Sequence, residues 1–457
     1  MIQTIRKAWG IPELRKKIIF TLLILLIFRI GNAIPVPYVD VNALEAYMSG
    51  MSTTIFGLLN AMSGGAFATA TIFALSIQPY INSSIIIQLL TIAIPALERL
   101  AKEGGEEGKK KIQSITRYTT VAIALLQGFG YYMLMKSNGI LLDTSIWAAL
   151  VIIVSFVAGS SFVMWMGEQV TEFGVGNGIS IILFGGILSR IPNAVSHMIT
   201  GVRTWSGVQD GSITLDALTK AGYTVQQAEN TLNSAIAPWG IPLILLGVLA
   251  LIVLVVVVND AERRIPVQYA KRQVGRKMYG GQSTNLPMKV NMSGVLPIIF
   301  AQSIASLPAT IAAFIKTQPE EGTFGYALLN AIDTKSILYM VVYFMMIIGF
   351  SYFYSTIQFN PVEISNNLKK QGGFIPGFRP GKPTSDFIAK VLSKITLFGA
   401  IFLGIVAMCP LIAGKVISNP ALAVGGTSVI IVVGVALETV RALESQMLMR
   451  QYKGFLE

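Results

Sequence analysis

The sequence predicts an all-α polytopic membrane protein of about ten transmembrane helices. Hydrophobic residues make up 53% of the 457 positions and charged residues only 13%, and the mean hydropathy is +0.64. Apolar runs of about 20 residues, the length that crosses the hydrocarbon core of a bilayer, recur along nearly the whole chain. Soluble globular proteins carry about twice this share of charge. One membrane domain therefore accounts for almost all of the sequence.

The apolar runs define the predicted spans in chain order. They cover residues 18–34, 70–96, 118–135, 146–166, 179–199, 238–258, 292–315, 337–357, 391–412 and 423–440. An even number of spans places both chain ends on one side of the membrane. The first run, behind a basic segment, also has the length of a signal-peptide core, an alternative that periodicity leaves open. We divide the chain into an N-terminal half, an external loop, a C-terminal half and a tail, at residues 1–200, 201–237, 238–440 and 441–457.

Basic residues orient these helices. Of the 35 Lys and Arg residues, 27 lie in the N-terminal segment, the loops after spans 2, 6 and 8, and the C-terminal segment, which all share one side. Seven lie on the other side. Arg29 lies near the outer end of the first span, where its side chain is expected to reach the interface. Because loops rich in Lys and Arg remain cytoplasmic, both termini are predicted to be cytoplasmic.

Several chemistries are excluded by what the spans lack. The chain has one cysteine, Cys409, expected to be buried, and one histidine, His197, so neither a disulfide nor a metal site is predicted. Apart from Arg29, we assign no Asp, Glu, Lys or Arg to the span interiors, counting Arg190 on the outer side and Glu438 at the cytoplasmic interface. Proton-coupled carriers usually keep ionisable residues in the span interiors. Residues 104–110 have the wrong glycine spacing for a phosphate-binding loop and are interpreted as a solvated basic turn. We predict no catalytic residue and no cofactor. The energy for this protein's task is expected to come from a partner or from a gradient.

Two segments of the membrane part have an unusual pattern. Residues 54–67 are too short to cross the bilayer and too apolar for a linker, which predicts a re-entrant helix or an interfacial amphipathic helix. In the second span Pro79 is expected to interrupt the helix, and four polar residues follow it. These are Asn82, Ser83, Ser84 and Gln88. They form either fixed contacts between helices or a seam that parts and closes.

Two cytoplasmic loops, 259–291 and 358–390, are longer than simple connections require. In the second loop, Pro376-Gly377 and Pro380-Gly381 predict turns on either side of Arg379, which then stands at a defined tip. A basic tip can bind lipid headgroups, RNA phosphates or an acidic protein surface. For any single lysine in these loops, membrane topology alone is a sufficient reason.

Seven motifs, in one order between about residues 10 and 450, resemble the SecY family, the channel subunits of the bacterial protein translocase. They are IFRIGNAIPVP, LNAMSGGAF, PYINSSIIIQLL, GEQVTEFGVGNGIS, YAKRQVGRKMYGGQSTNLPMKVN, FNPVEISNNLKKQGGFIPGFRPG and GGTSVIIVV. The sequence departs from the family pattern at Ser76, where glycine is common, and in the outer loop from Trp205 to Ala237, which is longer than expected.

The resemblance implies a channel that passes unfolded secretory polypeptides across the bacterial cytoplasmic (inner) membrane. It implies two inverted five-helix halves that part between spans 2 and 7 and release transmembrane segments into the bilayer. The implied constriction ring is Ile77, Ile81, Ile179, Leu183, Ile299 and Ile431. The implied lateral gate includes Asn82, Gln88 and Ser303. Residues 54–67 would be a re-entrant plug helix that includes Phe56, Leu58, Leu59, Met62, Gly64 and Gly65.

The same resemblance implies the partners. SecE and SecG are the expected small membrane subunits, and signal peptides and nascent chains are the expected passengers. The SecA motor and the ribosome are expected at Arg276, Lys277 and Arg379. YidC, SecDF and anionic lipids are further expected contacts. Two rival functions are a small-solute transporter, which needs ion-coupling residues in broken helices, and a lipid-modifying enzyme, which needs an Asp-rich or His-based site; the sequence shows neither.

Overall fold

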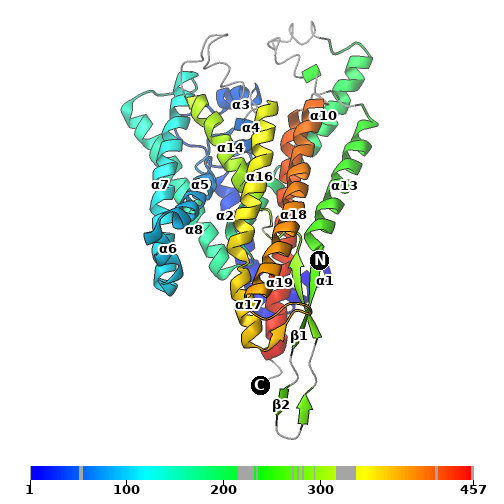
Figure 1. Cartoon of the computed structure of the whole chain (residues 1–457). Helices are drawn as coiled ribbons and strands as arrows, with labels where there is room; N and C mark the ends of the chain where they lie inside the picture. Colours follow the sequence, from blue (N-terminus) through cyan, green and yellow to red (C-terminus); the bar gives the residue numbers. More distant parts are fainter. Residues whose placement is uncertain are drawn as a thin grey trace.

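The computed structural model is an elongated bundle of helices with a small sheet at one end (Figure 1). It describes residues 2–50, 55–214, 231–232, 235, 237–269, 272–274, 277–279, 283–292, 294–314, 336–416 and 420–453. The elements of the N-terminal half are α1 (Ile2–Trp9), α2 (Pro12–Gly31), α3 (Val41–Gly50), α4 (Ile55–Met62), α5 (Gln78–Ala93), α6 (Pro95–Lys102), α7 (Gly105–Ser137), α8 (Ile146–Phe173), α9 (Gly178–Leu188) and α10 (Ile191–Gln209).

The C-terminal half contains both helices and strands. Its elements are α13 (Gly240–Asp260), β1 (Glu262–Tyr269), β2 (Arg272–Val274), β3 (Lys277–Tyr279), β4 (Ser283–Lys289), α14 (Leu296–Phe314), α16 (Ile337–Gln358), α17 (Pro361–Lys370), β5 (Gly373–Phe374), α18 (Lys382–Val416) and α19 (Pro420–Lys453). In Figure 1, α3, α4 and α10 lie at the end opposite the strands and α17. Both chain ends lie toward the end with the strands.

Five helical stretches among the described residues are long and apolar enough to cross a membrane. They are α8, the stretch Gly178–Gln209, α13, the stretch Ile337–Lys370 and the part of α18 up to Cys409. The pair α5 and α6 passes the same criteria together, but it is bent by 104°. The prediction of several helices long and apolar enough to cross a membrane is therefore confirmed.

The predicted span 70–96 is wrong at its beginning. Helix α5 starts only at Gln78, and Pro79 lies in its first turn, where a missing N–H costs nothing, instead of interrupting the helix. Ala70 and Ser76 have positive φ angles of 43° and 49°. Residues 70–77 instead bond to another segment, since Val36 N donates to Ala70 O at 2.9 Å and Ile72 N to Ile34 O at 3.0 Å. An apolar run cannot distinguish this buried turn from a helix.

Other boundaries also differ from the expectation. The predicted turn at 104–110 forms the first turns of α7, which begins at Gly105. The predicted fifth span breaks after Leu188, and α10 begins at Ile191 with Pro192 in its first turn. The segment predicted as a C-terminal tail, 441–457, is helical as far as Lys453, because α19 continues through it. Within the predicted external loop 201–237, residues 215–230, 233–234 and 236 lie outside the described residues.

The expectation of an all-α fold missed five short strands, which the structure describes within the two loops predicted to be cytoplasmic. β1 pairs antiparallel with both β4 and β5, giving the order β4-β1-β5, and β2 pairs with β3. The β5 pairing joins the loop 358–390 to the loop 259–291. One apolar cluster, including Ile265, Val267 and Ile388, holds the sheet against α17 and α18. The strands β1, β4 and β5 therefore form one folded unit with α17 and the start of α18.

Candidate functional site

The six predicted ring residues meet in one apolar cluster at the centre of the bundle. Ile77, Ile81, Leu183, Ile299 and Ile431 are at most 2% exposed and belong to it, and the partly buried Ile179 packs against it. These residues come from the start of α5 and from α9, α14 and α19. Both halves of the chain therefore contribute to one isoleucine-rich apolar cluster.

The short helix expected within 54–67 is present as α4, which contacts α9, α14 and α19. Phe56 and Met62 are buried, and Met62 is part of the central cluster. Leu59 is partly buried, while the Leu58 side chain lies outside the described part. The chain then turns at Gly64 and Gly65, whose φ angles are 73° and 98°. These angles favour glycine, which explains the Gly-Gly pair after the helix.

The seam between α5 and α14 carries the predicted gate residues. Asn82 and Ser303 are both buried, and Ser303 Oγ accepts a hydrogen bond from Gln78 Nε2 at 3.1 Å. Asn82 Oδ1 has no hydrogen-bond partner in the part of the chain that the structure describes. Gln88 donates to Ser84 Oγ at 3.2 Å. The structure thus places the three predicted gate residues on two touching helices.

Sequence reasoning missed two residues of this seam. Gln78 lies one helical turn before Asn82, a spacing that places both on one face and could have revealed it. Tyr354 of α16 donates its hydroxyl to Gln88 Oε1, which ties α16 to α5. Its ring lies 5.1 Å from that of Phe300 on α14. No local pattern marks Tyr354, because it is one of several aromatic residues in an apolar helix.

Two of the three predicted docking residues, Arg379 and Lys277, lie among the described residues of the two long loops. Arg379 is exposed and lies between Gly377 and Gly381, whose φ angles of 88° and 107° confirm the two predicted turns. The Arg379 carbonyl accepts a hydrogen bond from Thr384 Oγ1 at 2.8 Å, which fixes the turn to α18. Lys277 lies in β3. Arg276 falls outside the described residues.

A polar junction connects the sheet to the membrane helices. Asn291 Nδ2 donates to Asn259 Oδ1 at 2.7 Å in a buried site, and Arg441 of α19 donates to Asn259 O at 2.7 Å and also contacts Asp260. Burial lowers the pKa of the Lys289 ammonium, and the neighbouring Arg441 guanidinium lowers it further.

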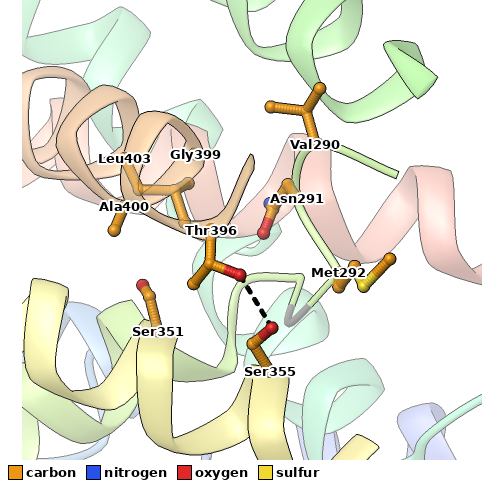
Figure 2. Close-up of a pocket in the computed structure, with 9 residues that line it drawn as sticks. All are labelled: Val290, Asn291, Met292, Ser351, Ser355, Thr396, Gly399, Ala400 and Leu403. Carbon is orange, nitrogen blue, oxygen red and sulfur yellow. Dashed lines mark hydrogen bonds between the residues drawn. The ribbon is translucent and has the colours of Figure 1, made fainter. Parts of the chain in front are cut away.

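Beside the junction lies a small polar cavity between α16 and α18, in which the hydroxyls of Ser355 and Thr396 are hydrogen-bonded at 2.8 Å (Figure 2).

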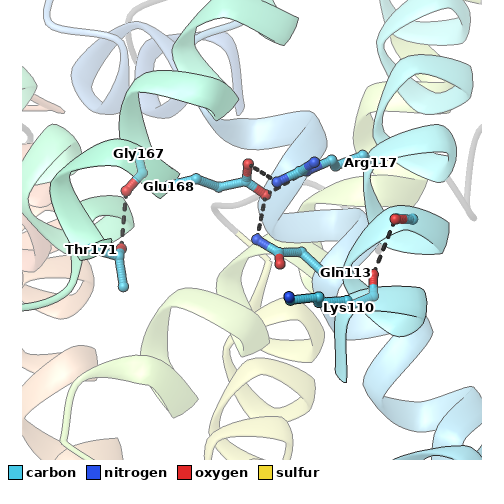
Figure 3. Close-up of polar contacts among 7 residues, drawn as sticks. Lys110, Gln113, Arg117, Gly167, Glu168 and Thr171 are labelled. Atoms are coloured by element: carbon cyan, nitrogen blue, oxygen red, sulfur yellow. Dashed lines mark hydrogen bonds and ion pairs between the residues drawn. The ribbon is translucent and has the colours of Figure 1, made fainter. Parts of the chain in front are cut away.

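A second polar contact stiffens the N-terminal half. Figure 3 shows Arg117 of α7 facing Glu168 of α8, with Gln113 beside it. Arg117 Nη2 lies 2.8 Å from Glu168 Oε2 and its Nε donates to Oε1 at 3.0 Å, while Gln113 Nε2 donates to the same Oε1 at 3.1 Å. The Glu168 side chain is only 9% exposed, so this bidentate pair compensates a nearly buried carboxylate and clamps α7 to α8.

Metal and thiol chemistry have no visible site in the described ranges. Within them, no group of three or more His, Cys, Asp or Glu residues could hold a metal ion. Cys409 is exposed, which corrects the expectation of a buried side chain. It lies at the end of the part of α18 that is long and apolar enough to cross a membrane. The backbone of His197 lies in α10, and its side chain is outside the described part.

The comparisons with known proteins agree with this arrangement. The SecY family model matches residues 71–440. The protein translocase subunit SecY of Streptomyces scabiei is 42% identical over 469 aligned positions, covering 100% of both chains. The SecY subunit of Halalkalibacterium halodurans is 41% identical, again over 100% of both chains.

Solved structures share the fold at low sequence identity. A SecY protein whose plug domain is described as stabilising the closed state of the translocation channel has a TM-score of 0.59 at 16% identity, covering 95% of this chain and 92% of that one. Sec61 in a canine ribosome-channel complex has a TM-score of 0.58 at 16% identity, with the same coverage. From the family model and the full-length identity, the chain belongs to the SecY family.

Proposed function

We propose that this chain is the pore-forming subunit of a protein translocation channel, which passes unfolded secretory polypeptides across the membrane and releases transmembrane segments laterally. The observation that carries the proposal is the central apolar cluster, to which both halves of the chain contribute and against which α4 packs. Membership of the SecY family gives the activity, and the geometry explains how such a site could perform it.

The ring is proposed to be Ile77, Ile81, Ile179, Leu183, Ile299 and Ile431. A narrow collar of bulky apolar side chains excludes water and ions by dewetting. The same side chains offer no hydrogen bond or charge that would hold a passing polypeptide, so the collar yields to many sequences. Helix α4 is proposed as the plug, since it packs against α9, α14 and α19 beside this collar.

The lateral gate is proposed to lie between α5 and α14. The hydrogen bond from Gln78 to Ser303 crosses this seam, and breaking such a bond costs about 0.5–1.5 kcal/mol. A seam held in this way can part when a hydrophobic segment replaces its apolar contacts. Gln88, Asn82 and Ser303 would then line the opening.

The gate assignment predicts an asymmetry between two tyrosines of α16. Tyr354→Phe removes the hydroxyl that contacts Gln88 on α5, so the closed gate is weakened and precursors with defective signal peptides should be exported about fivefold faster. Tyr352→Phe is the matched control, because Tyr352 donates to Ser393 O at 3.1 Å within the C-terminal half. Equal export by both variants would contradict the gate assignment. The measurement is the export rate in cells with a single chromosomal copy.

In the proposed membrane arrangement, ten spans form two inverted five-helix halves at 1–200 and 238–440, joined by the external loop 201–237. Both termini and the strand-bearing unit face the cytoplasm, since 27 of the 35 basic residues lie on that side. The membrane is proposed to be the bacterial cytoplasmic (inner) membrane, because the curated relatives compared above are bacterial.

The two long loops, 259–291 and 358–390, are proposed to face the cytoplasm and to form the docking surface for SecA and the ribosome. Their proposed basic contacts are Arg276, Lys277 and Arg379. The Sec61 structure that shares this fold was solved in a ribosome-channel complex, which supports the ribosome as a partner. SecE and SecG are proposed as companion subunits, YidC, SecDF and anionic lipids as further contacts, and signal peptides and nascent chains as passengers. No catalysis is assigned to the chain, so the driving force is proposed to come from a docked partner.

Crosslinking of a stalled secretory precursor tests the proposed function. Single cysteines replace Ile81 or Ile299 in a Cys409→Ser background, and the precursor carries a thiol in its mature region. We expect disulfide formation at both ring positions. Leu246, which is 66% exposed on α13, is the control position and should give none. Crosslinks at Leu246 equal to those at the ring would contradict a path through the centre.

A further inference from the structure

Two side chains of α2 meet the chain immediately after α4. A helix ends with carbonyl groups that lack partners within the helix. Beyond the last residue of α4, Met62, Asn32 Nδ2 donates to Ser63 O at 3.2 Å, and Arg29 Nη1 donates to Gly64 O at 3.4 Å. Asn32 is only 9% exposed, so its bond lies inside the bundle. These two bonds supply donors at the place where α4 ends.

Arg29 also reaches the end of a second helix. Its Nη1 donates to Ser189 Oγ at 3.1 Å, and Ser189 caps α9 while its own hydroxyl donates to Gly186 O at 2.7 Å. The C-terminal end of a helix carries partial negative charge, which a nearby guanidinium stabilises. One cation therefore lies beside the C-terminal ends of both α4 and α9.

The same two helix ends touch through their backbones. A Cβ atom at Gly64 would lie 2.9 Å from Gly186 O and from Ser189 Oγ, and a Cβ atom at Gly186 would lie 2.8 Å from Met62 O. Contacts below 3.0 Å are closer than side-chain carbons tolerate, so the approach requires glycine at both positions. Gly64 also has a φ angle of 73°, which glycine adopts without strain.

The chain beyond this contact bonds to other segments and also back to α4, since Ala68 N donates to Asn60 Oδ1 at 3.0 Å. The Tyr131 hydroxyl donates to Phe67 O, and Val36 N donates to Ala70 O at 2.9 Å. Residues 67–70 are therefore tied to α7 and to the segment after α2. If α4 moves relative to residues 67–70, the Asn60 bond breaks and the chain can rotate at Gly64 and Gly65. The Arg29 and Asn32 bonds lie at this hinge.

We propose that Arg29, Asn32 and Ser189 form a latch that holds α4 in its closed position at the hinge. The inference rests on the proposed role of α4 as a plug and adds the residues that retain it. It also gives Arg29 a role beyond reaching the membrane interface, because its donors are directed at two named acceptors. The Arg29 side chain is exposed, so its bonds can exchange with water when a polypeptide displaces α4.

The test measures the position of α4 directly. The full translocase is reconstituted with a single cysteine, Met62→Cys in a Cys409→Ser background, and a membrane-impermeant thiol reagent is added on the outer side. Met62 is 4% exposed, so the closed state labels slowly. We expect Arg29→Met and Asn32→Leu each to raise the labelling rate about tenfold, since each removes a donor and keeps the side-chain volume. Arg203→Met, at an exposed arginine of α10, is the matched control and should leave the rate unchanged.

Three further variants separate the latch from general damage. Arg29→Lys keeps the charge and should restore most of the slow labelling. A cysteine at Ile152, which is 0% exposed in the N-terminal core, should remain unlabelled in every variant if the fold is intact. Gly64→Ala acts from the α4 side and should also speed labelling. Because it opens the same contact, adding Arg29→Met to it should give less than the product of the two single effects.

The possible results distinguish the latch from the plug. If Arg29→Met and Asn32→Leu label at the rate of the unmodified chain, while deletion of residues 55–62 raises the ion conductance, the latch is wrong and the plug assignment stands. If that deletion leaves the conductance unchanged, α4 does not close the channel and both proposals fall. Faster labelling in the two α2 variants, with rescue by Arg29→Lys, supports the latch.

Discussion

Replacing Ile81 and Ile299 together by glycine should raise the ion conductance of reconstituted, resting channels more than about tenfold. Both side chains are 1% exposed in the central cluster. Burial of one isoleucine side chain stabilises a protein by about 1.5–3 kcal/mol. We expect each isoleucine that is removed from the narrow collar to lower the free-energy cost of filling the collar with water by a similar amount. Each 1.4 kcal/mol corresponds to a factor of ten. The measurement is single-channel or flux conductance in proteoliposomes without precursor.

A matched double variant separates the collar from a loss of stability. Ile152 and Ile347 are both 0% exposed, on α8 and α16, and belong to the separate cores of the two halves. Ile152→Gly with Ile347→Gly removes the same apolar volume from helices and should leave the conductance at the background level. Equal leak from both double variants would show that general loosening, and not the collar, controls the seal.

Arg379→Glu should reduce motor-driven export about a hundredfold while leaving the chain folded and inserted. The guanidinium stands exposed at a turn fixed by Gly377, Gly381 and the Thr384 bond to the Arg379 carbonyl. Reversing a charge at a docking contact costs about 2–5 kcal/mol when its partner charge is left unpaired. The measurements are the export rate of a SecA-dependent precursor and the binding of SecA to inverted membrane vesicles.

Lys370→Glu is the control for the docking prediction. Lys370 is exposed in the last turn of α17, in the same loop but outside the turn that carries Arg379. Its reversal changes the net charge equally and should leave most of the export. If Arg379→Glu exports normally, or if both variants lose export to the same extent, Arg379 has no specific part in docking.

The sequence predicted features whose causes are local. The Pro-Gly pairs around Arg379 dictate their turns through fixed φ angles, and the structure shows both turns. The short apolar segment ending in Gly64-Gly65 predicted a helix too short to span, and α4 is that helix. The ring and gate residues came from the resemblance, since an isoleucine in an apolar run carries no sign of which face it occupies.

The features that sequence reasoning missed depend on distant partners. Residues 70–77 form a buried turn because residues 34–36 supply their backbone hydrogen bonds, and an apolar run contains no sign of that. β1 forms with β4 and β5, and β5 lies about a hundred residues away, in a loop that looked irregular. Tyr354 and Arg29 donate hydrogen bonds to Gln88 and Gly64, which only the folded chain brings near.

The central claim is that a polypeptide crosses through the isoleucine-lined centre, and a crosslinking scan along α5 tests it most directly. Single cysteines are placed at successive positions from Ile77 to Leu89 and probed with a thiol in the mature region of a stalled precursor. We predict strong crosslinks at Ile77 and Ile81, which are at most 1% exposed, and none at Ile86 and Leu89, which are 40% and 39% exposed. Crosslinks that favour Ile86 and Leu89 would place the polypeptide outside the bundle and contradict the account.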